Sequence, residues 1–280
     1  MNINYLNFTN TTVYHSGRVP FFTFKNFEKL DFIRYGFSTR LGGVSKGDFS
    51  TMNLSFTLSD EPDRVGENFR LMGAALNIDC EDMIYAMQTH TANVMAVNHT
   101  HKGMGIIKER NFRDVDGLIT NEEGICLVTG HADCVPVFLA DPVRRAIGLS
   151  HAGWKGTVSD IAGATVKAMG ECYGCKPADM VAFIGPSICR DCYEIGADVA
   201  EKFAEAYGKL VFDDILFPEA SGKFKLDLHR ANFHNLLNAG LKEENIGLTD
   251  VCTCCNPDLL FSHRASHGKR GGMCGFLQIK

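Results

Sequence analysis

The stretch that decides the fold of this chain is ICLVTGHADCVPVFLADPVRRAIGLS, residues 125–150. It contains three short apolar runs, at 125–129, 134–139 and 146–150, separated by polar turns of a few residues. Apolar runs of this length predict buried β-strands. Because strand follows strand without a helix between them, we predict a mixed sheet in a layered α/β domain of α+β character.

The same stretch bears on the compartment in which the protein works. His131, Asp133, Asp141 and Arg144 interrupt its apolar residues, so it does not reach the roughly 20 apolar residues that a membrane-spanning helix needs. The N-terminus has neither the basic nor the apolar segment of an export signal. Eleven cysteines, an odd number, cannot all pair as disulfides. We therefore expect a cytoplasmic protein that does not bind membranes.

Length and charge narrow the class of protein further. The chain has 280 residues, with 28 Lys and Arg against 33 Asp and Glu, which gives a net charge of −5. This near balance supplies no basic footprint for nucleic acid. No repeat or linker divides the sequence, so we predict one domain over residues 1–280, in which residues 1–25 carry little of the motif pattern described below.

Apolar periodicity extends the prediction to both sides of the opening stretch. The predicted helices are 62–76, 157–170, 198–207 and 228–239, the last with Asp227 as its N-cap. The further predicted strands are 32–38, 83–86, 93–97, 180–184, 248–252 and 274–279.

Three polar clusters interrupt the apolar strands between residues 88 and 156. They are Gln88-Thr89-His90, Ala132-Asp133-Cys134 and His151-Ala152-Gly153-Trp154-Lys155-Gly156. Each cluster follows or precedes a predicted strand at its end, so the side chains can converge at one edge of a sheet.

Residues His90, Cys134 and His151 form a possible metal-binding set. Two imidazoles and one thiolate suit Zn²⁺ and leave a fourth position open for catalysis. The same residues without metal can act as a cysteine nucleophile with a histidine base. On residue types alone, a core thiol with two hydrogen-bonded loop histidines is an equal alternative.

Other polar residues near these clusters are candidates for substrate contacts. Arg40, before a glycine pair, is suited to clamping a phosphate, although a surface charge is an equal alternative. Asp116 and Asp133 are candidate acids, although the residues around Asp116 taken alone favour a simple turn. Trp154 can stack on a flat base or fill the core.

Several cysteine and histidine patterns resemble metal motifs without matching them fully. The pairs Cys172–Cys175 and Cys189–Cys192 have the spacing of a four-cysteine zinc ribbon, but residues 180–184 between them predict a buried strand. We interpret these four residues as free thiols. Cys252–Cys255 with His263 and His267 is too closely spaced for a two-Cys two-His finger. The single His99-Thr100-His101 motif is weak evidence for copper and favours a solvated loop.

Many short motifs taken together resemble the YfiH family, once labelled polyphenol oxidase or laccase-domain proteins. The match runs in order from about residue 37 to the C-terminus. Its motifs are Phe37–Ser45, Asn53–Leu54, Asn68–Arg70, Gln88–His90, Asp116–Thr120, Ala132–Pro136, His151–Trp154, Ile184–Ile188, Cys192–Glu194 and Asp227–Asn232.

The resemblance implies a fold, a cofactor and an activity. The fold is a layered α/β sandwich of the cytotoxic necrotizing factor or putative cysteine hydrolase type. The implied ligands are His90, Cys134 and His151, which bind zinc, with copper also reported for the family. The implied reactions are phosphorolysis of adenosine, inosine and 5′-methylthioadenosine and deamination of adenosine, so the expected partners are a nucleoside and phosphate.

The resemblance leaves three rival functions. Some bacterial members are linked to peptidoglycan precursors, which corresponds to a cysteine or zinc amide hydrolase. A zinc-ribbon interaction module and a copper-dependent polyphenol oxidase are the other two. Lys155 stands where the family usually has arginine, so it keeps a cation but lacks the planar fork that binds phosphate in two-pronged fashion.

Overall fold

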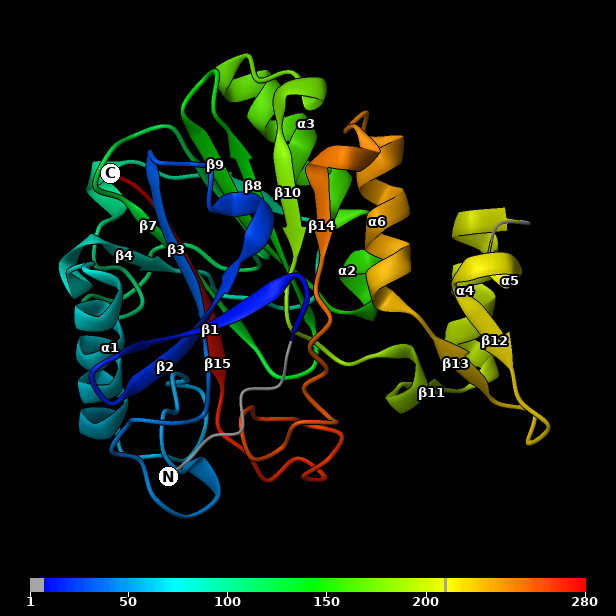
Figure 1. Cartoon of the computed structure of the whole chain (residues 1–280), viewed down its shortest axis with the longest axis horizontal. Coiled ribbons are helices and arrows are strands. Elements are labelled where there is room, and N and C mark those ends of the chain that lie inside the picture. Colours follow the sequence, from blue (N-terminus) through cyan, green and yellow to red (C-terminus); the bar gives the residue numbers. More distant parts are fainter. Residues whose placement is uncertain (1–7, 209–210) are drawn as a thin grey trace.

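Two six-stranded sheets lie face to face at the centre of the molecule, for which a computed structural model describes residues 8–208 and 211–280 (Figure 1). The first sheet has the order β1 (Thr11–Ser16), β2 (Val19–Phe24), β3 (Ile33–Ser38), β15 (Met273–Ile279), β7 (Cys126–His131), β4 (Met83–Tyr85). The second has the order β14 (Ile246–Leu248), β10 (Val181–Ile184), β8 (Val135–Asp141), β9 (Ala146–Ala152), β6 (Gly117–Thr120), β5 (Val94–Ala96). Parallel and antiparallel pairs occur in both, which confirms the predicted mixed sheets.

An aromatic cluster joins the two sheets. The ring of Phe24 in the first sheet stacks on Phe183 of the second with centroids 4.0 Å apart, and meets Phe138 edge-on at 4.8 Å. All three side chains are buried. Aromatic pairs in these arrangements add to the stabilisation that their buried area supplies.

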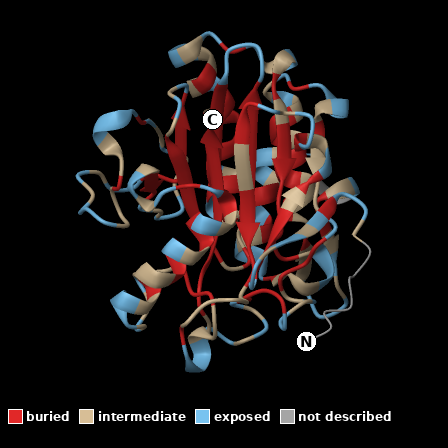
Figure 2. Ribbon diagram, turned by 60° about the vertical axis from the view of Figure 1, so that its left-hand side comes forward, coloured by how far each residue is buried: buried red, intermediate tan, exposed pale blue. Residues whose placement is uncertain are grey.

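Helices cover the outer faces of both sheets. Helix α1 (Pro62–Leu76) packs its apolar side against the first sheet. Helices α2 (Trp154–Val158), α3 (Ile161–Tyr173) and α6 (Leu228–Asn238) cover the second sheet. A small third sheet, β11 (Glu194–Ile195), β13 (Phe224–Leu226) and β12 (Leu216–Pro218), lies beside them with α4 (Ala197–Tyr207) and α5 (Val211–Asp214). Figure 2 shows the buried strands enclosed by helices with exposed outer sides.

The helix predictions are confirmed where the local signals are complete. Helix α1 has the predicted bounds, because Pro62 suits its first turn and Asn77 ends it in the left-handed conformation, with φ 56°. Helix α6 begins after Asp227, whose side chain accepts a hydrogen bond from the Arg230 amide at 3.0 Å.

Two element predictions are wrong. The predicted helix 157–170 is divided between α2 and α3, because Asp160 adopts a left-handed φ of 57° and caps α3 through the Gly163 amide. The strand predicted at 248–252 lies earlier, as β14 at Ile246–Leu248. The residues after Leu248 form a loop with a single bridge between Ser187 and Cys252. Strands β1 and β2 form a hairpin in the N-terminal segment, where we predicted no strand.

The two C-x-x-C pairs compared with a zinc ribbon, Cys172–Cys175 and Cys189–Cys192, lie apart in the structure. Strand β10 runs between them, antiparallel to β8, with Val181 opposite Ala140 and Ile184 opposite Val137. Cys175 therefore lies at one end of the strand and Cys189 at the other, which excludes the four-cysteine ribbon. Among the described residues, no helix has both the length and the apolarity needed to cross a membrane.

Truncation of Phe24 tests the contact between the sheets. We expect Phe24→Ala to lower the free energy of unfolding by about 3–5 kcal/mol, because it removes a ring buried between two others. Val143→Ala, at a side chain that is 68% exposed, should change it by less than about 0.5 kcal/mol. Urea unfolding followed by fluorescence measures both, and an equal effect of the two substitutions would contradict the packing described.

Candidate metal centre

Strand pairing brings the three polar clusters to one edge of the second sheet. Gly117 in β6 pairs with Ser150 in β9, so Asp116 and His151 are neighbours, and the His151 amide donates to the Asp116 carbonyl at 2.8 Å. Cys134 directly precedes β8, whose first residue pairs with Ala152. The loop that contains His90 follows β4 in the first sheet.

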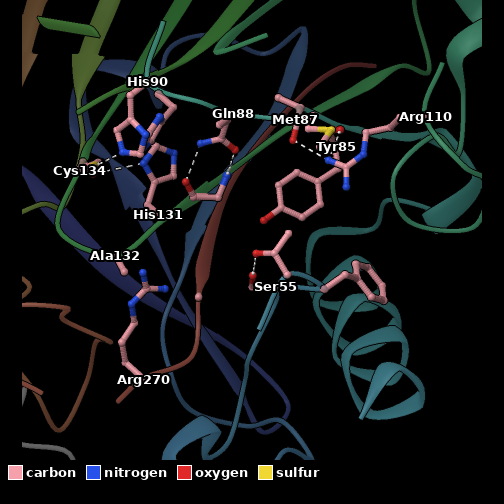
Figure 3. Close-up of a pocket in the computed structure, with 16 residues that line it drawn as sticks. Ser55, Tyr85, Met87, Gln88, His90, Arg110, His131, Ala132, Cys134 and Arg270 are labelled. Carbon is pink, nitrogen blue, oxygen red and sulfur yellow. Dashed lines mark hydrogen bonds between the residues drawn. The ribbon is translucent and has the colours of Figure 1, made fainter. Parts of the chain in front are cut away.

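Potential ligand atoms of His90, Cys134 and His151 all lie within 4.8 Å of one another. The Cys134 sulfur is 4.0 Å from His90 Nε2 (Figure 3). The ring centroids of His90 and His151 are 4.9 Å apart. Gly153 permits this approach, because a Cβ there would lie 2.6 Å from His90 Cδ2 and 3.1 Å from the Cys134 sulfur. The sequence-based expectation that these side chains converge is confirmed.

The buried carboxylate of Asp116 holds both histidine-bearing segments. Its oxygens accept hydrogen bonds from the amides of Thr89, His90 and Thr91 at 3.1, 3.1 and 2.8 Å, and from His151 Nδ1 at 2.8 Å. Burial raises the pKa of Asp116, but the donors outweigh it and hold that pKa well below its usual range. The hydrogen bonds from these backbone amides also hold His90 at a φ of 66°, a conformation that non-glycine residues rarely adopt.

His151 and Cys134 shift each other's pKa in the protein without metal. Because His151 Nδ1 faces Asp116, its Nε2 is the nitrogen left for Cys134. Burial lowers the pKa of His151, but the Cys134 thiolate and Asp116 raise it to about 9. Burial raises the pKa of Cys134, and His151 and His90 lower it to about 6. The thiolate, which is the form that binds metals and attacks electrophiles, is thus favoured near neutral pH.

Asp133 positions the backbone next to Cys134. Its φ is 84°, and its carboxylate accepts hydrogen bonds from Thr253 Oγ1 at 2.6 Å and from the Arg264 amide at 2.7 Å. The Ile188 amide donates to its carbonyl at 3.0 Å. Both carboxylate oxygens are therefore engaged by other parts of the chain, and Asp133 is not among the residues that line the cavity beside Cys134.

The donor set fits a metal ion with an open coordination position. Two histidines and one cysteine suit zinc, and a two-histidine, one-cysteine set also occurs at copper sites. The carboxylate of Asp116 behind His151 is the outer partner that metal-binding histidines usually have. The nearby His131 is not available as a ligand, because its two ring nitrogens contact Thr129 Oγ1 and the Cys134 carbonyl at 2.8 and 3.2 Å.

A cavity of about 260 Å³ opens in front of these donors. The side chain of Arg270 points toward Ala132 at one end of it, and Arg110 lies at the other, over the Tyr85 ring (Figure 3). The Nε of Arg270 is buried without a hydrogen-bond partner among the described residues. We did not predict either arginine; the glycine pair after Arg270 resembles the one after Arg40, whereas Arg110 has no local signal.

Three other predicted residues lie away from this cavity. Trp154 and Lys155 line a second cavity of about 620 Å³, which also contains His90, so His90 lies between the two cavities. Arg40 lines neither of them. Its guanidinium donates to the carbonyls of Ser50 and Pro257 and stands over the Phe261 ring at 4.7 Å.

The chain is similar to several known proteins. Residues 34–280 match the family described as multi-copper polyphenol oxidoreductase laccase. The purine nucleoside phosphorylase YlmD of Bacillus subtilis is 36% identical over 88% of this chain and 88% of its own. The adenosine deaminase RL5, of unknown prokaryotic origin, is 35% identical over 85% of this chain and 92% of its own. The crystal structure of the Bacillus licheniformis hypothetical protein YfiH has a TM-score of 0.89 and 30% identity, over 96% of this chain and 99% of that one.

Removal of the Asp116 charge tests whether this carboxylate positions His90 and His151 for metal binding. We expect Asp116→Asn to weaken metal binding about 10- to 100-fold, because the amide is a poorer acceptor for His151 and for the loop amides. Titration against a chelator of known affinity measures this. Asp114→Asn is the matched control, since Asp114 accepts hydrogen bonds from Thr89 Oγ1 and other loop groups and, among the described residues, from no histidine ring. Unchanged affinity in Asp116→Asn would contradict the assignment.

Proposed function

This chain belongs to the YfiH-type family described as multi-copper polyphenol oxidoreductase laccase, and we propose that it cleaves purine nucleosides with phosphate at the centre formed by His90, Cys134 and His151. The proposed substrates are adenosine, inosine and 5′-methylthioadenosine. Two relatives, named as a purine nucleoside phosphorylase and an adenosine deaminase, support this class of reaction.

The observation that carries the proposal is the buried Nε of Arg270, which has no hydrogen-bond partner among the described residues and lies in the cavity beside the three donors. A guanidinium with a free N–H in a buried position is a strong binding group for a phosphate oxygen. Burial lowers the pKa of Arg270, and the negative charges of Asp133 and Cys134 oppose this effect only in part, so the guanidinium lacks full solvation or a full counter-charge. We therefore assign phosphate binding to Arg270 in place of Arg40.

The second cavity offers a surface for the base. Trp154 is half-buried there, and Lys155 Nζ lies 5.6 Å from the centre of its ring. A purine can stack on an indole, an interaction of about 1–3 kcal/mol for a base on an aromatic side chain. Since His90 belongs to both cavities, a nucleoside that reaches from Trp154 toward Arg270 passes the proposed metal centre with its ribose.

In the proposed reaction a phosphate oxygen bonds to ribose C1′ while the bond from C1′ to the purine nitrogen breaks. The purine leaves with the bonding electrons and takes up the proton that the hydrogen phosphate gives up as it becomes ribose 1-phosphate. Arg270 orients the phosphate and balances its charge, and Asp116 keeps the His151 ring in place. A bound zinc ion would supply a Lewis acid at this point. His131 and Asp133 act as positioning residues through their contacts with the backbone around Cys134.

Phosphorolysis is tested directly with inosine and phosphate. We expect hypoxanthine and ribose 1-phosphate as products, measured by chromatography, and their loss in Cys134→Ala, which removes a proposed ligand. Cys172→Ser, at an exposed cysteine outside both cavities, is the control and should retain activity. Metal-loaded protein that forms neither product would refute the proposal.

The two cavities predict that substitutions in one raise the KM for phosphate and substitutions in the other raise the KM for the nucleoside. Arg270→Gln should raise the KM for phosphate about tenfold or more, because it removes a charged hydrogen-bond donor. Trp154→Ala should instead raise the KM for the nucleoside by roughly the same factor. Arg70→Gln, at a side chain that is 67% exposed on α1, should change neither KM. A reversed pattern would show that the substrates are placed the other way round.

An amide hydrolase is the second candidate, because Cys134, His151 and Asp116 also have the order of a cysteine nucleophile, its base and an orienting carboxylate. Its proposed substrates are peptidoglycan precursors. A thiol alkylator separates the two functions, since a nucleophile reacts in the protein as purified, whereas a ligand is protected by its metal.

We expect Cys134 to be modified only after a chelator has removed the metal. In the stripped protein, the modification rate should rise as the pH increases through about 6 and then level off, because the thiolate is the reactive form above its pKa. Mass spectrometry of the peptide containing Cys134 follows the reaction. Rapid modification before chelation would favour the hydrolase.

A further inference from the structure

Four cysteines from two separate parts of the chain lie close together in the structure. Cys189 and Cys192 flank a short turn after β10, and Cys252 and Cys255 lie in the loop after β14. Their sulfur atoms all lie within 4.8 Å of one another. Each pair has the C-x-x-C spacing, and the two pairs are about 60 residues apart in the chain.

The separations of the sulfur atoms match a tetrahedral zinc site. Zinc–sulfur bonds of about 2.3 Å place the sulfurs of a regular tetrahedron about 3.8 Å apart. The Cys255 sulfur is 3.4 Å from that of Cys192 and 4.0 Å from that of Cys189. These distances are far from the roughly 2.05 Å of a disulfide bond, and all four cysteines are free.

Backbone amides support the negative charge that such a site carries. The amide of Cys255 donates to the sulfur of Cys252 at 3.4 Å, within its own C-x-x-C turn. The amide of Cys189 donates to the same sulfur from the other loop at 3.2 Å. Four thiolates around one Zn²⁺ leave a net charge of −2, which N–H donors of this kind stabilise.

We propose that Cys189, Cys192, Cys252 and Cys255 bind a structural zinc ion, distinct from the centre at His90, Cys134 and His151. Four protein ligands close the coordination shell, so this ion has no position for substrate. Binding displaces the thiol protons of the ligands to solvent. Under this proposal Cys189 and Cys192, which we interpreted from the sequence as free thiols, share a zinc ion with Cys252 and Cys255, which we had compared with a finger.

The proposed ion ties together the two loops that hold Asp133. Ile188, next to Cys189, donates to the Asp133 carbonyl, and Thr253, next to Cys252, donates to its carboxylate. Arg264 reinforces the link, since its guanidinium donates to the Cys192 carbonyl at 3.1 Å while its amide binds Asp133. The zinc site thus supports the strained backbone that precedes Cys134.

Metal content tests the proposal, because the two sites can be emptied separately. The double variant Cys192→Ser/Cys255→Ser should contain one zinc equivalent per chain fewer than the wild type, as measured by elemental mass spectrometry. Cys134→Ala should lose a different equivalent. Cys254→Ser, in the same loop but outside the cluster, and Cys172→Ser are matched controls and should retain the full content. Unchanged zinc in the double variant would overturn the proposal.

Cobalt provides a test that does not depend on how well the double variant folds. Cys134→Ala loaded with Co²⁺ should show the intense sulfur-to-cobalt charge-transfer absorption of a four-thiolate site, and zinc X-ray absorption should show only sulfur neighbours near 2.3 Å. Absence of that absorption would overturn the proposal. So would a mass lower by two hydrogens in the denatured, unreduced protein, because it would show a disulfide. Neither result depends on nucleoside activity, so the proposed function can fail independently.

Discussion

The Asp116 carboxylate is the group on which the rest of the site depends. Its two oxygens hold three consecutive amides of the loop around His90 and the ring of His151, although these residues are far apart in the chain. A buried carboxylate is unfavourable unless donors satisfy it, and removal of a partner from such a pair costs several kcal/mol. The same bonds that stabilise the charge therefore fix the positions of two of the three donors.

The third donor depends on a different constraint, the backbone at Asp133. A left-handed non-glycine residue costs of order 1–3 kcal/mol. Each hydrogen bond to Asp133 contributes about 1 kcal/mol, so the bonds from Ile188, Thr253 and Arg264 together offset the strain. Asp116 and Asp133, which we first considered as acids, thus have most of their hydrogen-bonding capacity used by the protein itself.

The sequence predicts features that depend on local signals. Helix α1 has its proline, its periodic apolar face and its left-handed end within 16 residues, and the three polar clusters are visible because each interrupts an apolar strand. Arg40 and Arg270 illustrate what local sequence signals do not predict. Each stands near a glycine pair, so local sequence does not separate them. The pairing of Met273 with His131 brings Arg270 to the turn at Cys134, whereas Arg40 follows β3 on the far side of β15.

The cysteines also show that spacing in the sequence does not predict which residues come together in the fold. Spacing alone groups Cys189 and Cys192 with Cys172 and Cys175, the nearest similar pair. The antiparallel pairing of β10 with β8 carries those pairs to opposite ends of a strand, and the parallel pairing of β10 with β14 instead brings residues 185–192 beside residues 249–255. Since bonds to Asp133 from both of these loops balance its strain, the loops must be ordered for Cys134 to keep its position. In our two proposals the four-cysteine set and the three-donor set therefore have separate tasks, one in holding the backbone and the other in chemistry.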